Sequence, residues 1–328
     1  MSTQIVRYVG PGSVGIGLRE SAGGDGSGAD ANAGAEADAD AVVRPLALAS
    51  LKEQSLAGLL ELRLDDLRAA IESAPSADPV NDVRLLPPID GLTEVWAAGV
   101  TYHRSSEARQ EESQVADVYA RVYDAARPEL FFKSPAWRVC GHGEPIGVRA
   151  DSSVDVPEPE LAVVCNAFGE VVGLTVCNDV SSRSIEGENP LYLPQAKIYS
   201  GSCALGPGIV PIWQVPDPKA LDISVTVLRA ASGGSAAAGV AWAGRTSTSF
   251  LRRGLEDLVE HLFRQALFPQ GVVLSTGTGL VPALDFTLLP GDEVAIEIGG
   301  VGRLANPVRE AGAGSFGWLT PAPDRGPS

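Results

Sequence analysis

The chain has 328 residues, of which 45% are hydrophobic and 20% are charged. These proportions are ordinary for a globular protein with a sizeable core, and they exclude a wholly disordered chain. The formal net charge of −16 argues against nucleic acid or an anionic membrane surface as the main partner, because both bind to a basic face.

The first 88 residues predict a small α+β domain. We expect strands at Gln4–Val9 and Val42–Leu48 and a helix at Leu56–Ser73, where leucines recur at three- and four-residue steps as on a helix that faces a core. Ser21–Asp40 consists almost entirely of Ala, Gly, Asp, Glu and Ser, a composition typical of a disordered acidic loop. The proline-rich stretch Pro75–Pro88 is typical of a linker.

Residues 89–328 predict a second domain that is mainly β. Its short runs rich in Val and Ile are bounded by turn residues, as strands of a sheet are. The runs are Val95–Val100, Leu161–Val164, Val171–Val176, Ile223–Val227, Val272–Leu274 and Glu293–Ile298. Two helices are expected, at Ser106–Ala126 and Ser249–Ala266. Because strands and helices do not alternate, the sequence predicts an α+β fold, mainly β, rather than a βαβ array.

Two observations predict a cytoplasmic location. No apolar run reaches the roughly 20 residues of a membrane-spanning helix, and Met1–Gly10 lacks the basic region and apolar stretch of a signal peptide. The four cysteines are widely spaced without a C-x-x-C pair, so neither a zinc site nor a disulfide framework is indicated. We expect the cysteines to be structural.

Three carboxylates around one predicted hairpin suit a metal ion. Glu158 and Glu160 stand two residues apart on an extended segment, so both side chains point to one face. A turn at Asn166–Gly169 would bring Asp179 back beside them. Carboxylates without nearby Cys or His form a hard oxygen site for Mg²⁺, with Mn²⁺ or Ca²⁺ as substitutes. Spacing alone leaves the alternative open that the two glutamates lie on a solvated strand face.

A series of motifs in one order extends from about Val95 to Val308. The motifs are Gly99-Val-Thr-Tyr102, Pro128-Glu-Leu-Phe-Phe-Lys133, Glu158-x-Glu160, Asn178-Asp179-Val-Ser-Ser-Arg183, Lys197, Gly201-Ser-x-x-Leu-Gly206-Pro207, Ser275-Thr-Gly-Thr278-Gly and Pro290-Gly-Asp292. Together they resemble the fumarylacetoacetate hydrolase superfamily. Glu188-Asn-Pro-Leu-Tyr-Leu-Pro-Gln-Ala-Lys197 is most similar to its 2-keto-3-deoxy-D-arabinonate dehydratase branch. The resemblance implies a mixed β-roll catalytic domain, a homodimer, and Mg²⁺ held at Glu158, Glu160 and Asp179.

Departures from the family pattern favour elimination over hydrolysis. Many hydrolases of the family carry a Tyr-x-x-His motif whose His helps to activate water, whereas Ser105 stands three residues after Tyr102. The common Ser-Ala-Arg-Asp element lacks its acid at Ser184, and the Lys-Ser-Phe-Asp element lacks another at Ser200. We therefore expect a Mg²⁺-dependent dehydratase that acts on a 2-keto-3-deoxy sugar acid, giving 2,5-dioxopentanoate from a pentonate.

Two other functions stay open at this point. A hydrolase of acylpyruvate or fumarylacetoacetate type would use the same metal ion but would add water to a second carbonyl. A non-catalytic domain would bind metal and keto acid without turnover. In each case the partner is a small keto acid.

Two residues are candidates for proton transfer. Lys197 is expected to handle protons, because partial burial beside a dication favours the neutral amine. Its alternative role is that of a salt-bridge partner of Glu160 or Asp179. Glu129 precedes an apolar run, where burial would suit it to general acid or base work. A plain surface glutamate before a strand is the alternative.

Three residues are candidates for substrate binding. Thr278 lies in a Gly-Thr-Gly turn and would bind the substrate carboxylate through its hydroxyl and backbone N–H, unless it serves the turn alone. Arg104 and Lys133 are cations suited to an acidic substrate, and ordinary surface charges are the alternative for both.

Overall fold

The computed structural model describes residues 3–10, 13–20, 42–48, 55–75, 77–81, 83–105, 121–230 and 238–312. The acidic loop expected at residues 21–40 and the first part of the helix expected at residues 106–126 lie outside these ranges. Residues 121–124 of that helix are helical. None of the helices within the described ranges is long and apolar enough to cross a membrane.

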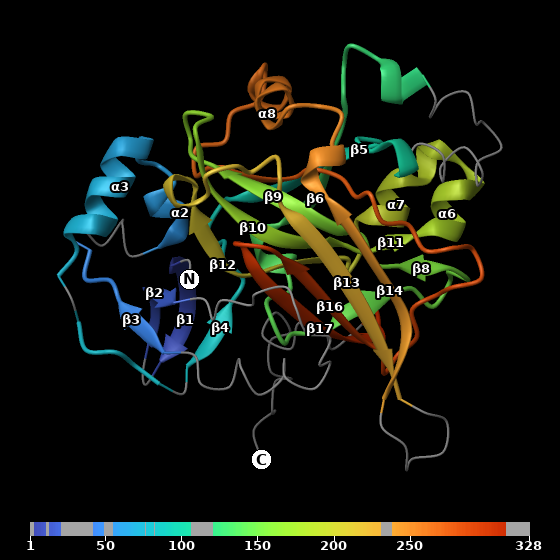
Figure 1. Cartoon of the computed structure of the whole chain (residues 1–328), viewed down its shortest axis with the longest axis horizontal. Helices are drawn as coiled ribbons and strands as arrows, with labels where there is room; N and C mark the ends of the chain where they lie inside the picture. Colours follow the sequence, from blue (N-terminus) through green and yellow to red (C-terminus); the bar gives the residue numbers. More distant parts are fainter. Residues whose placement is uncertain are drawn as a thin grey trace, which may run out of the picture.

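The larger of two main sheets crosses the middle of the molecule (Figure 1). It contains β1 (Thr3–Gly10), β2 (Ser13–Glu20), β3 (Val43–Pro45), β4 (Arg84–Leu86), β5 (Glu94–Gly99), β6 (Glu129–Pro135), β9 (Pro159–Cys165), β10 (Val171–Asp179), β12 (Cys203–Pro211) and β15 (Val272–Ser275). Its strand order is β3-β2-β1-β12-β10-β9-β15-β5-β6, and β4 pairs with β1. The strands are antiparallel except for the pair β5–β15.

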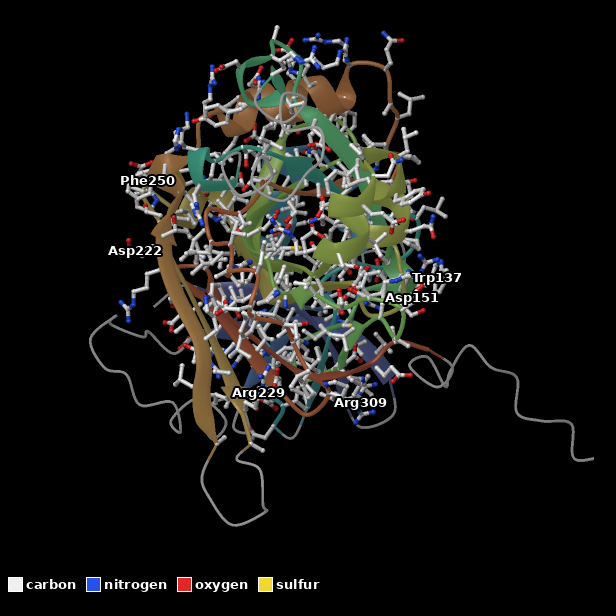
Figure 2. All side chains as sticks on the ribbon, turned by 90° about the vertical axis from the view of Figure 1, so that its right-hand side faces the viewer. Trp137, Asp151, Asp222, Arg229, Phe250 and Arg309 are labelled. Atoms are coloured by element: carbon white, nitrogen blue, oxygen red, sulfur yellow. The ribbon has the colours of Figure 1, made fainter. Side chains whose placement is uncertain are left out.

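The smaller sheet packs against the larger one. It contains β7 (Ile146–Val148), β13 (Asp222–Arg229), β14 (Gly239–Ser247), β16 (Glu293–Ile298) and β17 (Gly302–Glu310), in the order β14-β13-β16-β17-β7. Buried Val and Leu side chains of β10 and buried Val and Ile side chains of β13 and β16 share one hydrophobic core. Side chains fill the interior, and the exposed residues Trp137 and Phe250 lie at the outside (Figure 2). The expected α+β fold, mainly β and with mixed sheets, is confirmed.

Short elements connect or cover the sheets. Among the described residues they include β8 (Asp155–Val156), β11 (Ser181–Ser182), α2 (Leu56–Leu59), α3 (Leu64–Ser73), α6 (Arg183–Glu188), α7 (Leu193–Lys197) and α8 (Leu255–Phe263), with 3₁₀ turns at Ala136–Arg138, Pro190–Tyr192, Ile212–Gln214 and Thr248–Phe250. β8 pairs with β11. α6 and α7 contact this pair and lie on one side of the sheets (Figure 1).

The single helix expected over residues 56–73 is two helices. After α2, the carbonyl of Leu60 accepts a hydrogen bond from Ala167 N in the β9–β10 turn, at 2.8 Å. α3 begins at Leu64, whose backbone N–H donates to Glu170 Oε2 at 2.9 Å. The β9–β10 turn thus forms hydrogen bonds with backbone groups that would bond within the helix if it were continuous. Leucine spacing cannot show this, because the competing partners lie about a hundred residues away.

The segment Pro75–Pro88 is more than a linker. β4 lies within it and pairs with β1, with Arg7 opposite Leu86. β1 in turn pairs with β12 at Ile5 and Ile209, so the N-terminal strands continue the sheet that carries β9 and β10. The division of the chain into domains at residue 88 stays a prediction.

The helix expected over residues 249–266 begins only at Leu255. The backbone N–H of Arg252 donates to the carbonyl of Thr101 at 3.0 Å, which holds the preceding residues against another loop. Gly254 is the N-cap residue of α8, and its backbone is extended, with φ −65° and ψ 148°. Tertiary bonding therefore shortens the helix at its start.

Candidate active site

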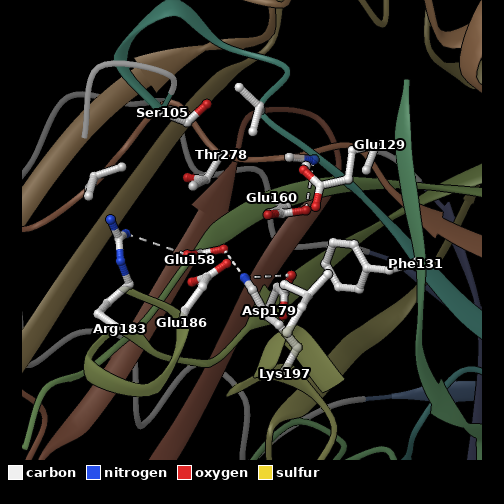
Figure 3. A pocket seen from close by; sticks show the side chains of 16 residues that line it. Ser105, Glu129, Phe131, Glu158, Glu160, Asp179, Arg183, Glu186, Lys197 and Thr278 are labelled. Atoms are coloured by element: carbon white, nitrogen blue, oxygen red, sulfur yellow. Dashed lines mark hydrogen bonds and ion pairs between the residues drawn. The ribbon is translucent and has the colours of Figure 1, made fainter. Parts of the chain in front are cut away.

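The β9–β10 hairpin assembles three acids. Glu158 directly precedes β9, Glu160 lies in it, and Asp179 ends β10. The backbone N–H of Asp179 donates to the carbonyl of Glu158 at 3.0 Å, so the hairpin closes as the sequence predicts. One carboxylate oxygen from each acid lies within 4.8 Å of the others. The three side chains meet in one pocket (Figure 3).

The donor set fits a hard divalent cation. The three acids are 1–3% exposed, and burial together with the charges of Asp179 and Glu158 raises the pKa of Glu160 to about 8. A cation between the carboxylates would offset this repulsion and desolvation. Because the ligands are carboxylate oxygens only, the residues present fit Mg²⁺, and also Mn²⁺ or Ca²⁺.

Glu160 is held in place by the segment after β15. Ser275 Oγ donates to Glu160 Oε2 at 2.6 Å, and the backbone N–H of Gly277 donates to the same oxygen at 2.8 Å. Gly277 has φ +91°, and a Cβ there would lie 1.9 Å from Thr101 Oγ1. This position therefore requires glycine, which lets the backbone approach Glu160.

Lys197, in the last turn of α7, lies among the acids. Its Nζ donates to Glu158 Oε2 at 2.6 Å, to Asp179 Oδ2 at 3.2 Å and to Ser181 Oγ at 2.5 Å. The ammonium also lies 5.7 Å from the centre of the Phe131 ring. The ion pair with Asp179, one of the two expected partners, is present, and Glu158 is a further acidic partner. A role in proton transfer stays a prediction.

Lys133 lies behind the acids rather than in the pocket. Its side chain is 0% exposed and forms an ion pair with Asp179 Oδ1. Nζ also donates to the carbonyls of Val180 at 3.0 Å and Lys197 at 2.6 Å. Lys133 does not line the pocket. The alternative of an ordinary surface charge is therefore wrong. The expected contact with substrate stays a prediction, and the buried position of Lys133 favours a structural role.

The structure brings two further predicted residues to the pocket and leaves one outside. Glu129, at the start of β6, and Thr278 both line the pocket, whereas Arg104 is exposed and does not. A Cβ at Gly99 would lie 2.2 Å from Glu129 Oε2, so this glycine makes room for the carboxylate. Thr278 Oγ1 accepts a hydrogen bond from Leu280 N at 3.1 Å. Thr278 therefore also forms a hydrogen bond within its own turn, which is the alternative role expected for it.

Sequence reasoning missed two charged pocket residues on α6. Ser182 caps this helix by accepting a hydrogen bond from Ile185 N at 3.4 Å. Arg183 and Glu186, three residues apart, then fall on one helix face; both are 3% exposed and line the pocket. Arg183 Nη1 lies 3.7 Å from Glu158 Oε1. Two opposite charges at this spacing, four and seven residues after Asp179, are the signal that would have identified them.

The chain is similar in sequence to known proteins. The family described as "Fumarylacetoacetate (FAA) hydrolase C-terminal" matches residues 94–309. The chain is 48% identical over 245 residues to a probable 2-keto-3-deoxyxylonate dehydratase of Haloferax volcanii, covering 74% of this chain and 82% of that one. It is 43% identical over 235 residues to the 2-dehydro-3-deoxy-D-arabinonate dehydratase of Saccharolobus solfataricus, covering 70% and 76% of the two chains.

A solved structure extends the similarity to nearly the whole chain. It is a 2-keto-3-deoxy-D-arabinonate dehydratase complexed with magnesium and 2,5-dioxopentanoate, with a TM-score of 0.72 and 33% identity over 94% of this chain and 99% of that one. The family match, over residues 94–309, includes the β9–β10 hairpin with its acids. The chain therefore belongs to the fumarylacetoacetate hydrolase family.

Proposed function

We propose that the protein is a Mg²⁺-dependent dehydratase that converts a 2-keto-3-deoxy pentonate to 2,5-dioxopentanoate. The observation that carries this proposal is the buried group of Glu158, Glu160 and Asp179 in one pocket with Lys197 and Glu129. Its relatives named as dehydratases of keto-deoxy sugar acids support the substrate class. Ser105, where many hydrolases of the family carry a histidine, supports elimination over hydrolysis.

The acids of the hairpin would hold the cofactor. Mg²⁺ bound by Glu158, Glu160 and Asp179 supplies a Lewis acid for the keto-acid end of the substrate. Lys133 fixes Asp179 from behind through their buried ion pair. Ser275 and Gly277 fix Glu160 through hydrogen bonds. The chain thus orients the two carboxylates before a ligand binds, and pre-oriented charge is the more effective kind in catalysis.

Glu129 is the proposed base. The reaction breaks the C3–H and C4–O bonds, and the electron pair of the C3–H bond forms the C3–C4 double bond. Glu129 accepts the C3 proton, since it reaches the pocket from β6, on a different element from the acids that hold the metal. The C4 hydroxyl leaves as water after it receives a proton. The enone then loses a proton from C5 and gains one at C3, and the resulting enol becomes the C5 aldehyde.

Lys197 and Thr278 would serve the two ends of the substrate. Lys197 lines the pocket and donates hydrogen bonds to Glu158, Asp179 and Ser181. Its ammonium would donate the proton that the leaving hydroxyl takes. Thr278 presents its hydroxyl and backbone N–H at the pocket wall, where they would bind the substrate carboxylate.

A substrate screen tests the proposal. Purified protein is incubated with 2-keto-3-deoxy-D-arabinonate, its xylonate epimer, an acylpyruvate or fumarylacetoacetate, each with Mg²⁺ or with excess chelator. We expect the aldehyde 2,5-dioxopentanoate from a pentonate, only with Mg²⁺, detected by mass spectrometry. Pyruvate and a free acid from the acylpyruvate would support the hydrolase instead. No turnover of any substrate would support a binding protein.

The proposal includes a homodimer in the cytoplasm. The dimer is implied by the family resemblance, and the location is the one that agrees with four widely spaced cysteines. Light scattering coupled to size-exclusion chromatography measures the mass of the particle. A mass near twice that of one chain is expected.

A further inference from the structure

We propose that Gly99 is a positioning residue for Glu129, because the absence of a side chain at position 99 leaves the space that the Glu129 carboxylate occupies in the pocket. This inference rests on the proposed function, in which Glu129 accepts the C3 proton, and deepens it. It names the residue that decides where the proposed base lies.

Gly99 and Glu129 face each other at the end of a strand pair. β5 and β6 are antiparallel, and these two residues are the last partners in their register. The side chains of directly opposite residues lie on one face of a sheet, close enough to contact each other. Both residues line the pocket, so the end of this strand pair forms part of the pocket wall.

The carboxylate of Glu129 lies where a side chain of residue 99 would lie. A Cβ added to Gly99 would be 2.2 Å from Glu129 Oε2, 2.7 Å from Cδ and 3.3 Å from Cγ. Because the distance shortens towards the tip of the side chain, Glu129 extends from β6 across to β5. Figure 3 shows its carboxylate pointing towards Glu160, on the side of the pocket where the three acids meet. Even the methyl group of an alanine at position 99 is incompatible with this position of the carboxylate.

The backbone of Gly99 does not itself require glycine. Gly99 is a strand residue without a positive φ, a conformation that alanine adopts without strain. The three heavy atoms nearest to an added Cβ, apart from those of the adjacent residues, all belong to Glu129. The contact with Glu129 is therefore what excludes a larger residue.

The chain after Gly99 is held in place by distant segments. Val100 also lines the pocket and has φ +53°, which is strained for a β-branched residue and persists only where the surroundings fix it. Thr101 Oγ1 donates to the carbonyl of Thr276 at 2.7 Å, and the carbonyl of Thr101 accepts from Arg252 N at 3.0 Å. A methyl group at position 99 should therefore displace the flexible Glu129 side chain rather than the backbone.

Gly99→Ala should impair catalysis while the fold stays intact. Cβ contacts are essentially never shorter than 3.0 Å, so Glu129 Oε2 must move by roughly 1 Å or more, and such a displacement can cost about 100-fold in rate. We expect kcat for the 2-keto-3-deoxy pentonate to fall about 100-fold and KM to change less than about 3-fold. The melting temperature should be at or above that of the wild type, because alanine restricts the unfolded chain more than glycine does.

Gly239→Ala is the matched control. Gly239 begins β14, has no positive φ, and has nothing within 4 Å of an added Cβ. This variant should leave kcat and KM unchanged, which separates the contact with Glu129 from the general effect of replacing a strand glycine.

A double variant separates displacement of the base from obstruction of the pocket. Glu129→Gln keeps the shape of the side chain but removes the proposed base, so its displacement should cost little further rate. We expect Gly99→Ala to lower kcat less than about 3-fold when it is added to Glu129→Gln, a strongly non-additive result. A methyl group that obstructs the substrate would lower the rate in both backgrounds alike.

The binding of pyruvate with Mg²⁺, measured by calorimetry, shows whether the site is retained. Gly99→Ala should bind pyruvate within about 3-fold of the wild type, since pyruvate has the keto acid but loses no water. A wild-type kcat of Gly99→Ala, an equal loss in the Glu129→Gln background, or a loss of pyruvate binding or of melting temperature overturns this inference alone. A Glu129→Gln protein with full kcat overturns the assignment of the base as well. A wild type that does not dehydrate the pentonate overturns the proposed function and this inference together.

Discussion

Lys133 and Asp179 form an ion pair in which the side chains are 0% and 2% exposed. The lysine comes from β6 and the aspartate from the end of β10, so the pair joins strands that are not neighbours in the sheet. Because Lys133 also donates to the carbonyl of Lys197 at 2.6 Å, one buried cation fixes both Asp179 and the end of α7.

Removing that cation should destabilise the protein. Lys133→Met removes one of the two buried cations that pair with Asp179, leaving Lys197 as the other, and breaking a buried ion pair typically costs about 3–5 kcal/mol. We expect the free energy of unfolding in urea to fall by this amount. Lys219→Met is the control, since it breaks an ion pair with Glu256 whose side chains are 57% and 75% exposed, and it should cost less than about 1 kcal/mol. Equal effects of the two substitutions would contradict the role of Lys133.

Gly277→Ala should weaken both the fold and the metal site. The new Cβ would meet Thr101 Oγ1 at 1.9 Å and would push the backbone N–H away from Glu160. Gly300→Ala is a matched control, because Gly300 has a similar positive φ of 74° but nothing within 4 Å of an added Cβ. Circular dichroism melting and Mg²⁺ titration should show a larger loss for Gly277→Ala in both measurements. A loss no greater than that of Gly300→Ala would argue against the close approach.

Asp155 should make stability depend on pH. It is 3% exposed, and burial raises its pKa to about 6, above the roughly 3.9 of an unfolded aspartate. The folded protein therefore binds this proton more tightly, and the resulting stabilisation is lost as the pH rises through 6. The free energy of unfolding of Asp155→Asn, relative to that of the wild type, should therefore rise by about 2 kcal/mol from pH 4 to pH 7.5, measured by urea unfolding.

The control for this pH effect is Asp151→Asn. Asp151 is exposed, and its hydrogen bond with Arg149 lowers its pKa. The free energy of unfolding of Asp151→Asn, relative to that of the wild type, should therefore not rise with pH. If the difference in unfolding free energy between Asp155→Asn and the wild type does not change with pH, the raised pKa of Asp155 is contradicted.

Glu129→Gln should lower kcat without removing the metal. As the proposed base, Glu129 is expected to contribute roughly 10²- to 10⁴-fold to the rate. Mg²⁺ affinity should stay within about 3-fold of the wild type, because Glu129 does not belong to the cluster of Glu158, Glu160 and Asp179 oxygens. Glu256→Gln on the outside of α8 serves as the control and should leave kcat unchanged. A Glu129 variant with only a raised KM would assign it to binding instead of proton transfer.

The acids of the site could be brought together from the sequence because local rules decide their positions. Alternation along a strand places Glu158 and Glu160 on one face, and the turn at Asn166–Gly169 returns the chain so that Asp179 comes beside them. Each step needs only neighbouring residues. The same locality makes the strands of β9 and β10 predictable.

Other features depend on partners far along the chain and could not be predicted. The break between α2 and α3 follows from bonds to Ala167 and Glu170. Lys133 looks like a cation for an acidic substrate until β6, β10 and α7 bury it. Glu186 can be recognised as a pocket residue only when the position of α6 at the pocket is known. Tertiary packing decides all three, and no periodicity encodes it.

Mg²⁺ titration of metal-stripped protein by calorimetry, followed by the dehydration assay on the same samples, tests the central claim most directly. We expect the wild type to bind Mg²⁺ and to form 2,5-dioxopentanoate only when it is bound. Asp179→Asn should lose both properties, since one of three carboxylate ligands is gone. Full turnover by the metal-stripped wild type, or an Asp179→Asn protein that keeps its Mg²⁺ affinity, would contradict the account.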